Sequence, residues 1–221
     1  MQFPKNSWSE VLKETLTSSK TKALFEHIDT LYNQIQVVPT KDKVFKAFEL
    51  TPFNEVKVVI LGQDPYPNAQ DAMGLAFSIP NTQKLPKSLV NIFKELQNDL
   101  KQPLRTTGDL TDWATQGVLL LNTALTNIAG ERDAHKKIGW NETFSTPVIK
   151  ALNARNQPTV FILWGKSAQV YANYITSPQH LVLSAPHPSP LGAYRGFWDS
   201  KPFSKTNDFL IKTGQQPIKW S

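Results

Sequence analysis

The stretch VKVVILGQDPYP, residues 56–67, decides the fold: an unbroken apolar run ends abruptly in a polar, proline-containing loop. Three further apolar runs, at residues 118–121, 160–164 and 181–184, also end in polar, glycine-rich or proline-rich loops. Unbroken apolar runs, as opposed to alternating ones, are typical of strands that are covered on both faces. We therefore expect four buried strands.

Segments with apolar residues at helical spacing separate these runs and surround them. They cover about residues 88–100, 141–153, 166–174 and 204–213, and three more precede the first strand near 7–16, 22–36 and 42–49. This alternation predicts an α/β fold, a three-layer domain with a central, largely parallel four-stranded sheet flanked by helices. No repeat or linker-like stretch divides the chain, so residues 1–221 are expected to form a single domain.

Composition excludes several classes of protein. The chain is 40% hydrophobic and 19% charged, which excludes disorder along its whole length. It has no cysteine, so disulfides, thiolate chemistry and cysteine-ligated metals are excluded. No apolar run could span a membrane, and residues 1–10 lack the apolar core of a signal peptide. These features predict a soluble, cytoplasmic protein that does not bind membranes.

The net charge of +6 favours a polyanionic partner such as nucleic acid, but it is equally compatible with lysines that only confer solubility. The ends of the strands are more informative, because ligands of open α/β sheets bind beyond the carboxyl ends of the strands. The loops at residues 62–67, 122–124, 165–169 and 185–191 should therefore converge. Prolines beside Asp64 and His187 restrict the backbone there before any ligand arrives.

The chain resembles family 1 of the uracil-DNA glycosylases. The resemblance lies in GQDPY at 62–66, GLAFS at 74–78, LLLNTALT at 119–126, WGKSAQ at 164–169, HPSPL at 187–191 and AYRGF at 193–197. It implies a DNA repair enzyme that flips uracil out of DNA and hydrolyses its N-glycosidic bond, leaving an abasic site. No cofactor is implied.

The resemblance gives catalytic roles to two residues. Asp64 would orient the attacking water and stabilise positive charge on the sugar. His187 would donate a hydrogen bond to uracil O2 as negative charge builds on the departing base. Taken alone, each has a plainer interpretation, because Asp64 could be a turn residue and His187 a structural histidine.

Four residues would form the uracil-binding pocket. The Asn122 amide would recognise O4 and N3–H of uracil, a pattern that cytosine inverts. Phe77 would stack under the base, Tyr66 would exclude the methyl group of thymine, and Gln63 would line the pocket. Without the resemblance, Asn122 could simply end a strand and the aromatic residues could belong to the core.

The resemblance also gives a set of residues that would contact DNA. They are Ser88, Gly165, Lys166, Ser189, Leu191 and Arg195. Ser88 and Ser189, with backbone amides at Gly165 and Lys166, would hold phosphates. Leu191 would fill the space that the flipped nucleotide vacates. Helix capping or turn formation explains Ser88 equally well.

Four positions depart from the usual pattern of the family. Pro67-Asn68 stands where His-Gly is common, Met73 where His is common, and Lys166 and Gly192 where Ser is common. Lys166 could contact phosphate as a point charge, and Gly192 would add flexibility. We expect weaker or more salt-sensitive DNA binding and a functional enzyme.

The sequence contains no other motif of a catalytic or metal-binding site. Its four histidines (His27, His135, His180 and His187) are not accompanied by clusters of Asp or Glu residues that could complete a metal site. We therefore expect no catalytic metal and activity in EDTA. The expected partners are uracil-containing DNA, single- or double-stranded, and a protein inhibitor that mimics DNA; the chain itself should be a monomer. Two alternatives are a DNA-binding protein that has lost catalysis and an enzyme with altered base choice. The presence of Asp64 and His187 disfavours a protein that has lost catalysis. The presence of Tyr66 and Asn122 disfavours an altered choice of base.

Overall fold

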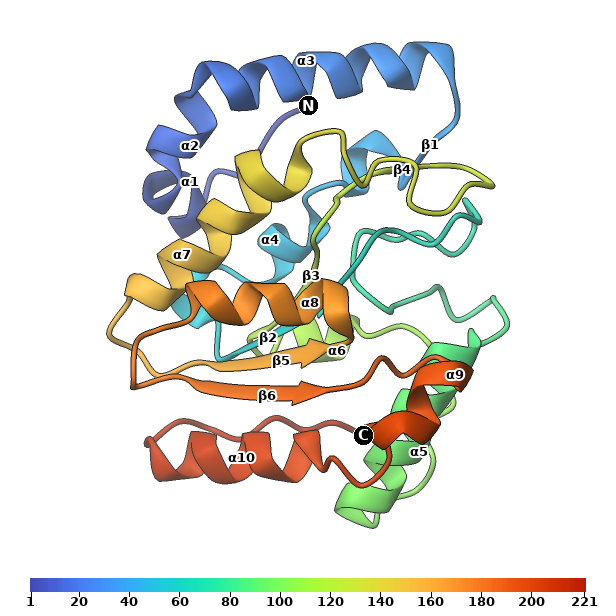
Figure 1. Ribbon diagram of the computed structural model, residues 1–221, viewed down its shortest axis with the longest axis vertical. Coiled ribbons are helices and arrows are strands. Elements are labelled where there is room, and N and C mark those ends of the chain that lie inside the picture. Colours follow the sequence, from blue (N-terminus) through green and yellow to red (C-terminus); the bar gives the residue numbers. More distant parts are fainter.

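The computed structural model describes all residues, Met1–Ser221, and has a parallel sheet at its centre (Figure 1). The sheet comprises β2 (Val58–Gly62), β3 (Val118–Asn122), β5 (Val160–Trp164) and β6 (Leu181–Ala185). Their order is β3-β2-β5-β6, and each pair of neighbours is parallel. The four predicted strands and the parallel sheet are confirmed.

Helices lie on both sides of the sheet, with α3, α7 and α8 above it and α5 and α10 below it in the view of Figure 1. The helices are α1 (Ser7–Val11), α2 (Lys13–Thr17), α3 (Ser19–Gln34), α4 (Lys46–Leu50), α5 (Lys87–Leu100), α6 (Thr111–Ala114), α7 (Thr146–Ala154), α8 (Lys166–Gln169), α9 (Pro190–Gly192) and α10 (Pro202–Lys212). A π-helical turn, Asn141–Ser145, precedes α7. The three-layer α/β architecture is therefore confirmed.

The strands differ in how completely they are covered. Every residue of β2, β3 and β5 is buried. In β6 only Ala185 is buried, although β3, the strand at the opposite edge of the sheet, is buried throughout. The expectation that all four runs are covered on both faces is thus wrong for β6, because α4 and α6 pack against β3 whereas no helix packs as closely against β6.

A second, antiparallel sheet joins β1 (Val37–Val38) to β4 (Asn127–Ile128). The sequence did not predict it, because strands of two residues are too short to show a period. It ties the end of α3 to the segment that follows β3, whose path bears on the site described below.

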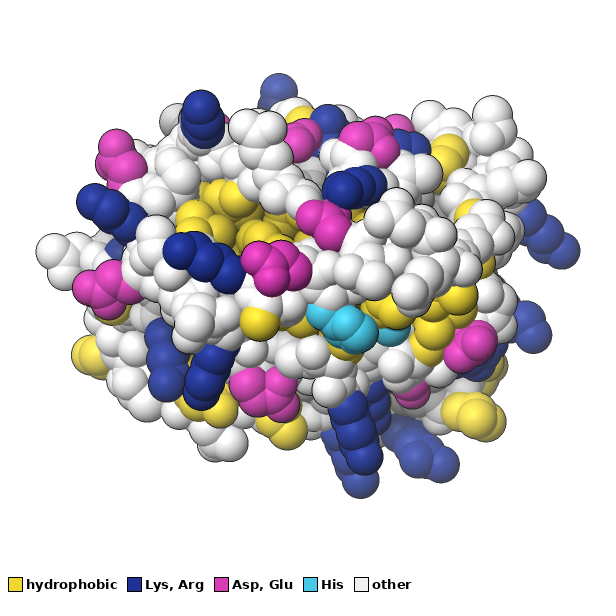
Figure 2. All heavy atoms as spheres, turned by 90° about the horizontal axis from the view of Figure 1, so that it is seen from above, with side chains coloured by type: hydrophobic (Ala, Val, Ile, Leu, Met, Phe, Trp, Pro, Cys, Tyr) yellow, Lys and Arg dark blue, Asp and Glu magenta, His cyan; other side chains and the backbone are white.

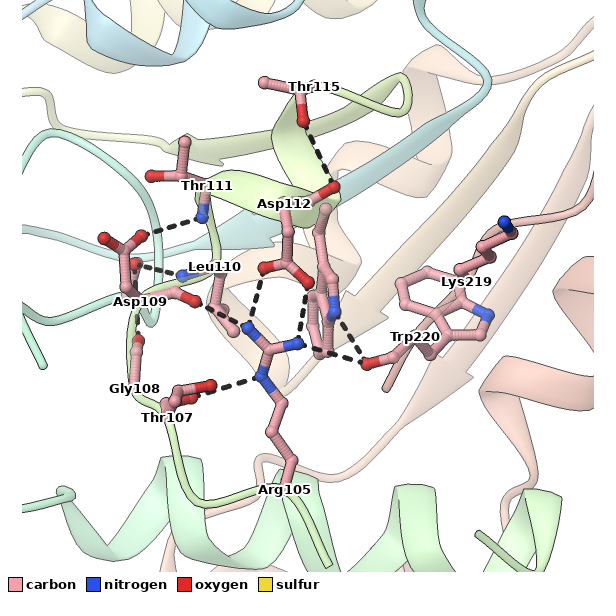
Figure 3. Close-up of polar contacts among 12 residues, drawn as sticks. Arg105, Thr107, Gly108, Asp109, Leu110, Thr111, Asp112, Thr115, Lys219 and Trp220 are labelled. Carbon is pink, nitrogen blue, oxygen red and sulfur yellow. Dashed lines mark hydrogen bonds and ion pairs between the residues drawn. The ribbon is translucent and has the colours of Figure 1, made fainter. Parts of the chain in front are cut away.

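The loop between α5 and β3 is fastened by one arginine (Figure 3). Arg105 donates two hydrogen bonds of 2.7 Å to the Asp112 carboxylate and one of 2.6 Å to the carbonyl of Asp109. Its guanidinium lies 5.5 Å from the ring of Trp113, whose Nε1 donates to the carbonyl of Trp220. This cluster secures both the loop and the end of the chain.

The same loop supports the GLAFS segment. The Gly108 carbonyl accepts a hydrogen bond from Ile79 N–H at 3.0 Å, and Ser78 Oγ accepts one from Leu110 N–H at 2.9 Å. Ser78 directly follows Phe77, so the backbone beside Phe77 is held from outside the sheet.

The surface seen from above in Figure 2, to which α3 contributes, carries Lys and Arg side chains among Asp and Glu side chains. The positive excess of the chain is therefore not gathered on this face. No helix is both long enough and apolar enough to cross a membrane.

Candidate active site

A cavity of about 400 Å³ lies beyond the carboxyl ends of the strands. It brings together the six residues predicted for catalysis and base binding; they are Gln63, Asp64, Tyr66, Phe77, Asn122 and His187. These side chains come from the loops after β2, β3 and β6 and from the segment before α5. Because the strands are parallel, these loops meet at one edge of the sheet.

Asp64 is held by two donors on one of its carboxylate oxygens. Asn127 Nδ2 donates to Asp64 Oδ2 at 2.8 Å, and the backbone N–H of Asp133 donates to the same oxygen at 3.1 Å. Burial raises the pKa of Asp64, and the nearby Asp133 adds to this, whereas the Asp133 N–H acts in the opposite direction. The site thus fixes a half-buried carboxylate in one orientation.

His187 is oriented by the loop that carries it. The backbone N–H of Ser189 donates to His187 Nδ1 at 3.0 Å. In the neutral ring, the proton therefore resides on Nε2, which can donate. Burial lowers the pKa of His187, so the ring is neutral at pH 7.

These two pKa shifts predict the pH dependence of the reaction. In the role that the resemblance implies, Asp64 must be ionised, so the acid limb of kcat/KM should lie above the pKa of an exposed aspartate, because burial raises the pKa of Asp64. In the same way, a neutral His187 predicts no loss of activity as pH rises through about 6.5, where an ordinary histidine titrates, while protonation of His187 adds to the loss at low pH. Measuring kcat/KM from about pH 4 to 9 checks both statements. A loss centred near 6.5 with rising pH would instead indicate that histidinium is the active form.

Asn122 ends β3 and lies beside Gly62 of β2, which is its register partner. A Cβ atom at Gly62 would overlap with Asn122 Oδ1, so glycine is required for this approach. The Asn122 side chain is buried, with the residue 9% exposed. An amide packed in this way can offer one donor and one acceptor in a fixed direction.

The aromatic residues of the cavity support each other. Phe77 has a left-handed backbone, with φ of 65°, and its ring meets Trp164 edge-on at 5.6 Å. The Tyr66 hydroxyl donates to the Phe77 carbonyl at 3.0 Å. Burial raises the pKa of the Tyr66 phenol, which keeps this donor protonated. Both rings are therefore fixed around the space that a base would fill.

The predicted DNA-contacting residues differ in their place relative to this cavity. Ser88 and Ser189 line it, while Gly165 and Lys166 line a smaller neighbouring cavity of about 140 Å³. Gly165 has a φ of 85°, and a Cβ there would come within 2.9 Å of His187 Cβ. Leu191 is 82% exposed.

Arg195 also lies on the surface, in the π-helical turn Ala193–Phe197 that follows α9. Of the departures from the family pattern, Pro67 and Met73 line the large cavity. Gly192 is packed closely, because a Cβ there would overlap with the His187 carbonyl oxygen. The flexibility expected at Gly192 stays a prediction, and the structure adds that the missing side chain permits close packing against the His187 backbone.

Three residues of the site were not identified from the sequence. Asn127 reaches the site from β4, and Arg132 and Asp133 reach it from the segment between β4 and the π-helical turn before α7. This segment has no apolar period, and its path depends on the two-residue strand β4. Only the position of Asn127, directly after LLLNTALT, hinted at its involvement.

Comparison with known proteins gives a consistent result. The family model described as "Uracil DNA glycosylase superfamily" matches residues 48–211. The uracil-DNA glycosylase of Clostridium beijerinckii is 49% identical over 216 residues, covering 98% of this chain and 96% of that protein. The one from Streptococcus thermophilus is 49% identical over 215 residues, covering 97% and 98%.

Solved structures agree with these sequence matches. The crystal structure of mimivirus uracil-DNA glycosylase superposes with a TM-score of 0.92 at 26% identity, covering 99% of this chain and 87% of that one. A variant of mimivirus UNG, in complex with UGI, gives a TM-score of 0.93 at 26% identity, covering 99% and 89%.

Proposed function

Because the chain belongs to the uracil-DNA glycosylase superfamily and removes uracil from DNA at the start of base excision repair, we propose that Asp64 and His187 carry out this reaction. The observation that carries the proposal is their place in one cavity with Asn122, Phe77 and Tyr66. Water adds to the sugar C1′ and loses a proton, and the bond from C1′ to uracil N1 breaks. The electron pair of this bond leaves with the base as the uracil anion, which takes up a proton from solvent to give free uracil.

Asp64 acts on the sugar side of this bond. As the bond lengthens, positive charge develops on the deoxyribose, and a fixed carboxylate stabilises that charge without having to reorganise. The hydrogen bonds to Oδ2 leave Oδ1 free of protein donors, so this oxygen can orient the attacking water.

His187 acts on the base side. Negative charge spreads over the departing uracil, and the Nε2–H donor stabilises it at O2. The Ser189 N–H on Nδ1 sets this tautomer before the substrate binds. Since the ring is neutral, it stabilises the uracil anion by a hydrogen bond and need not transfer its proton.

The remaining side chains select the base. Asn122 donates to O4 and accepts from N3–H of uracil, while Phe77 stacks on the ring. Tyr66 occupies the space that the C5 methyl of thymine would need, and Gln63 closes one wall. Each mismatched polar contact costs about 1–3 kcal/mol, so two together discriminate strongly against cytosine.

The mouth of the cavity binds DNA, single- or double-stranded. The phosphates are held by Ser88, Ser189 and the backbone amides at Gly165 and Lys166. The exposed side chain of Leu191 fills the space that the flipped nucleotide leaves between the stacked bases. Arg195 and the Lys166 side chain add charge contacts, which makes binding sensitive to salt.

The chain acts as a monomer without a cofactor. A protein inhibitor that mimics DNA would cover the same mouth, an inference supported by the mimivirus enzyme in complex with UGI. The DNA substrate, together with the bacterial origin of the relatives, supports a cytoplasmic location.

Replacing Asn122 by Asp tests the base-reading role. The carboxylate has the same shape but cannot donate to O4, so excision of uracil should fall by roughly 10-fold or more. Excision of cytosine should become detectable, because the new acceptor suits its amino group. Matched uracil and cytosine strands measure both effects, and an unchanged preference for uracil would refute the role of Asn122.

A further inference from the structure

Asp133 lies in an unusual backbone conformation beside the catalytic carboxylate. Its φ is 58°, in the left-handed region that residues other than glycine seldom adopt. In this conformation its N–H points at Asp64 Oδ2, 3.1 Å away. Such backbone strain persists where the surroundings enforce it, and it clusters at functional sites.

The surroundings of Asp133 enforce this conformation from both sides. The N–H of the next residue, Ala134, donates to Asn127 Oδ1 at 3.1 Å, and Asn127 Nδ2 donates to the Glu131 carbonyl at 2.9 Å. His135 Nδ1 lies 2.8 Å from Thr126 Oγ1. The segment is therefore tied back to β4 and to Thr126, the residue that precedes β4.

The Asp133 side chain has a separate partner. Its carboxylate accepts a hydrogen bond from Gln63 Nε2, and Gln63 Oε1 accepts one from Ser167 Oγ at 3.2 Å. These contacts link the segment after β4 to the start of α8. They form a wall between the uracil cavity and a second cavity of about 530 Å³, which shares Gln63, Asp64 and Asp133 with it.

We propose that Asp133 is a positioning residue for this reaction: its N–H orients Asp64, and its carboxylate orients Gln63. This inference rests on the proposed function of Asp64. The nearby Asp133 charge raises the pKa of Asp64 further than burial alone does.

Other charged groups face Asp64 as well. Arg132 and Lys136, from the same segment as Asp133, lower its pKa. Lys166 and Glu142 line the second cavity with Asp64, and His187 faces it across the first. Asp133 differs from all of these because it also contacts Asp64 through its backbone.

The decisive variant is Asp133→Asn, which keeps the shape and an acceptor for Gln63 but removes the charge. The acid limb of kcat/KM for uracil excision should move to lower pH. The matched control, Glu131→Gln, removes the same charge from an exposed side chain two residues away and should leave the limb in place.

A second pair of variants tests the backbone. Asp133→Ala loses the contact to Gln63 and disfavours the left-handed conformation, so kcat should fall roughly 10-fold, as expected for a displaced hydrogen bond to a charged group. Asp133→Gly loses the same side chain but accepts this conformation, so it should retain more activity than the alanine variant.

The proposal is overturned if Asp133→Asn leaves the acid limb at the wild-type position, or if the alanine and glycine variants are equally active. Thermal unfolding of each variant identifies any that fails to fold. If the alanine or glycine variant fails to fold, the pH profile of Asp133→Asn alone tests the proposal. If the wild-type chain did not excise uracil, the proposed function itself would be refuted. If the variants were active with unchanged pH profiles of kcat/KM, only the positioning role of Asp133 would be refuted.

Discussion

Replacing Asp64 by Asn is expected to lower kcat for uracil excision by roughly 10²–10³-fold, the loss that follows removal of one preorganised electrostatic contact. Asparagine has the same shape, and its Oδ1 can accept the hydrogen bonds that Asn127 and Asp133 now give to Asp64. The fold and the pocket should survive. What disappears is the negative charge beside the sugar in the transition state.

Single-turnover excision with saturating enzyme measures this effect on chemistry alone. Asp208→Asn is the matched control, because it makes the same change on an exposed position of α10, outside the cavity. Binding of a uracil-containing strand should be retained in both variants. A rate within tenfold of wild type for Asp64→Asn would remove Asp64 from its catalytic role.

Replacing His187 by Ala is expected to lower kcat by roughly 10²-fold or more, because the donor to the departing base is lost. The His187 ring also contacts its surroundings, with its centroid 6.1 Å from that of Phe77. Its main contribution nevertheless comes in the transition state, where O2 carries more negative charge than in the bound substrate. The effect should therefore fall on kcat more than on KM.

The control for this variant is His27→Ala, since His27 is exposed on α3, away from the cavity. Steady-state kinetics on one uracil strand separates the two constants. An increase in KM with unchanged kcat would show that His187 only binds the substrate.

The fold could be predicted from the sequence because its strands are apolar runs. The runs Val58–Gly62 and Val118–Asn122 are fully buried, and their lengths and spacing leave little alternative to a parallel sheet. The small sheet of β1 and β4 could not be predicted, because two residues show no period. The partial exposure of β6 depends on which strands the helices pack against, and local pattern does not encode this.

The site was predictable where its residues lie at the end of a strand or just beyond it, as Asn122 and Asp64 do. Asp133 was not, because it comes to Asp64 through long-range contacts of an irregular segment. Gly192 shows a related limit. Its close packing against the His187 carbonyl, which the missing side chain permits, depends on tertiary contacts that local sequence does not encode.

The central claim is that one cavity both selects and releases uracil. The most direct test is to incubate the chain in EDTA with labelled strands that carry uracil, thymine or cytosine at one position. We predict alkali-labile cleavage at uracil only. Cleavage at thymine or cytosine would contradict the selection by Tyr66 and Asn122, and tight binding without cleavage would contradict the catalytic roles of Asp64 and His187.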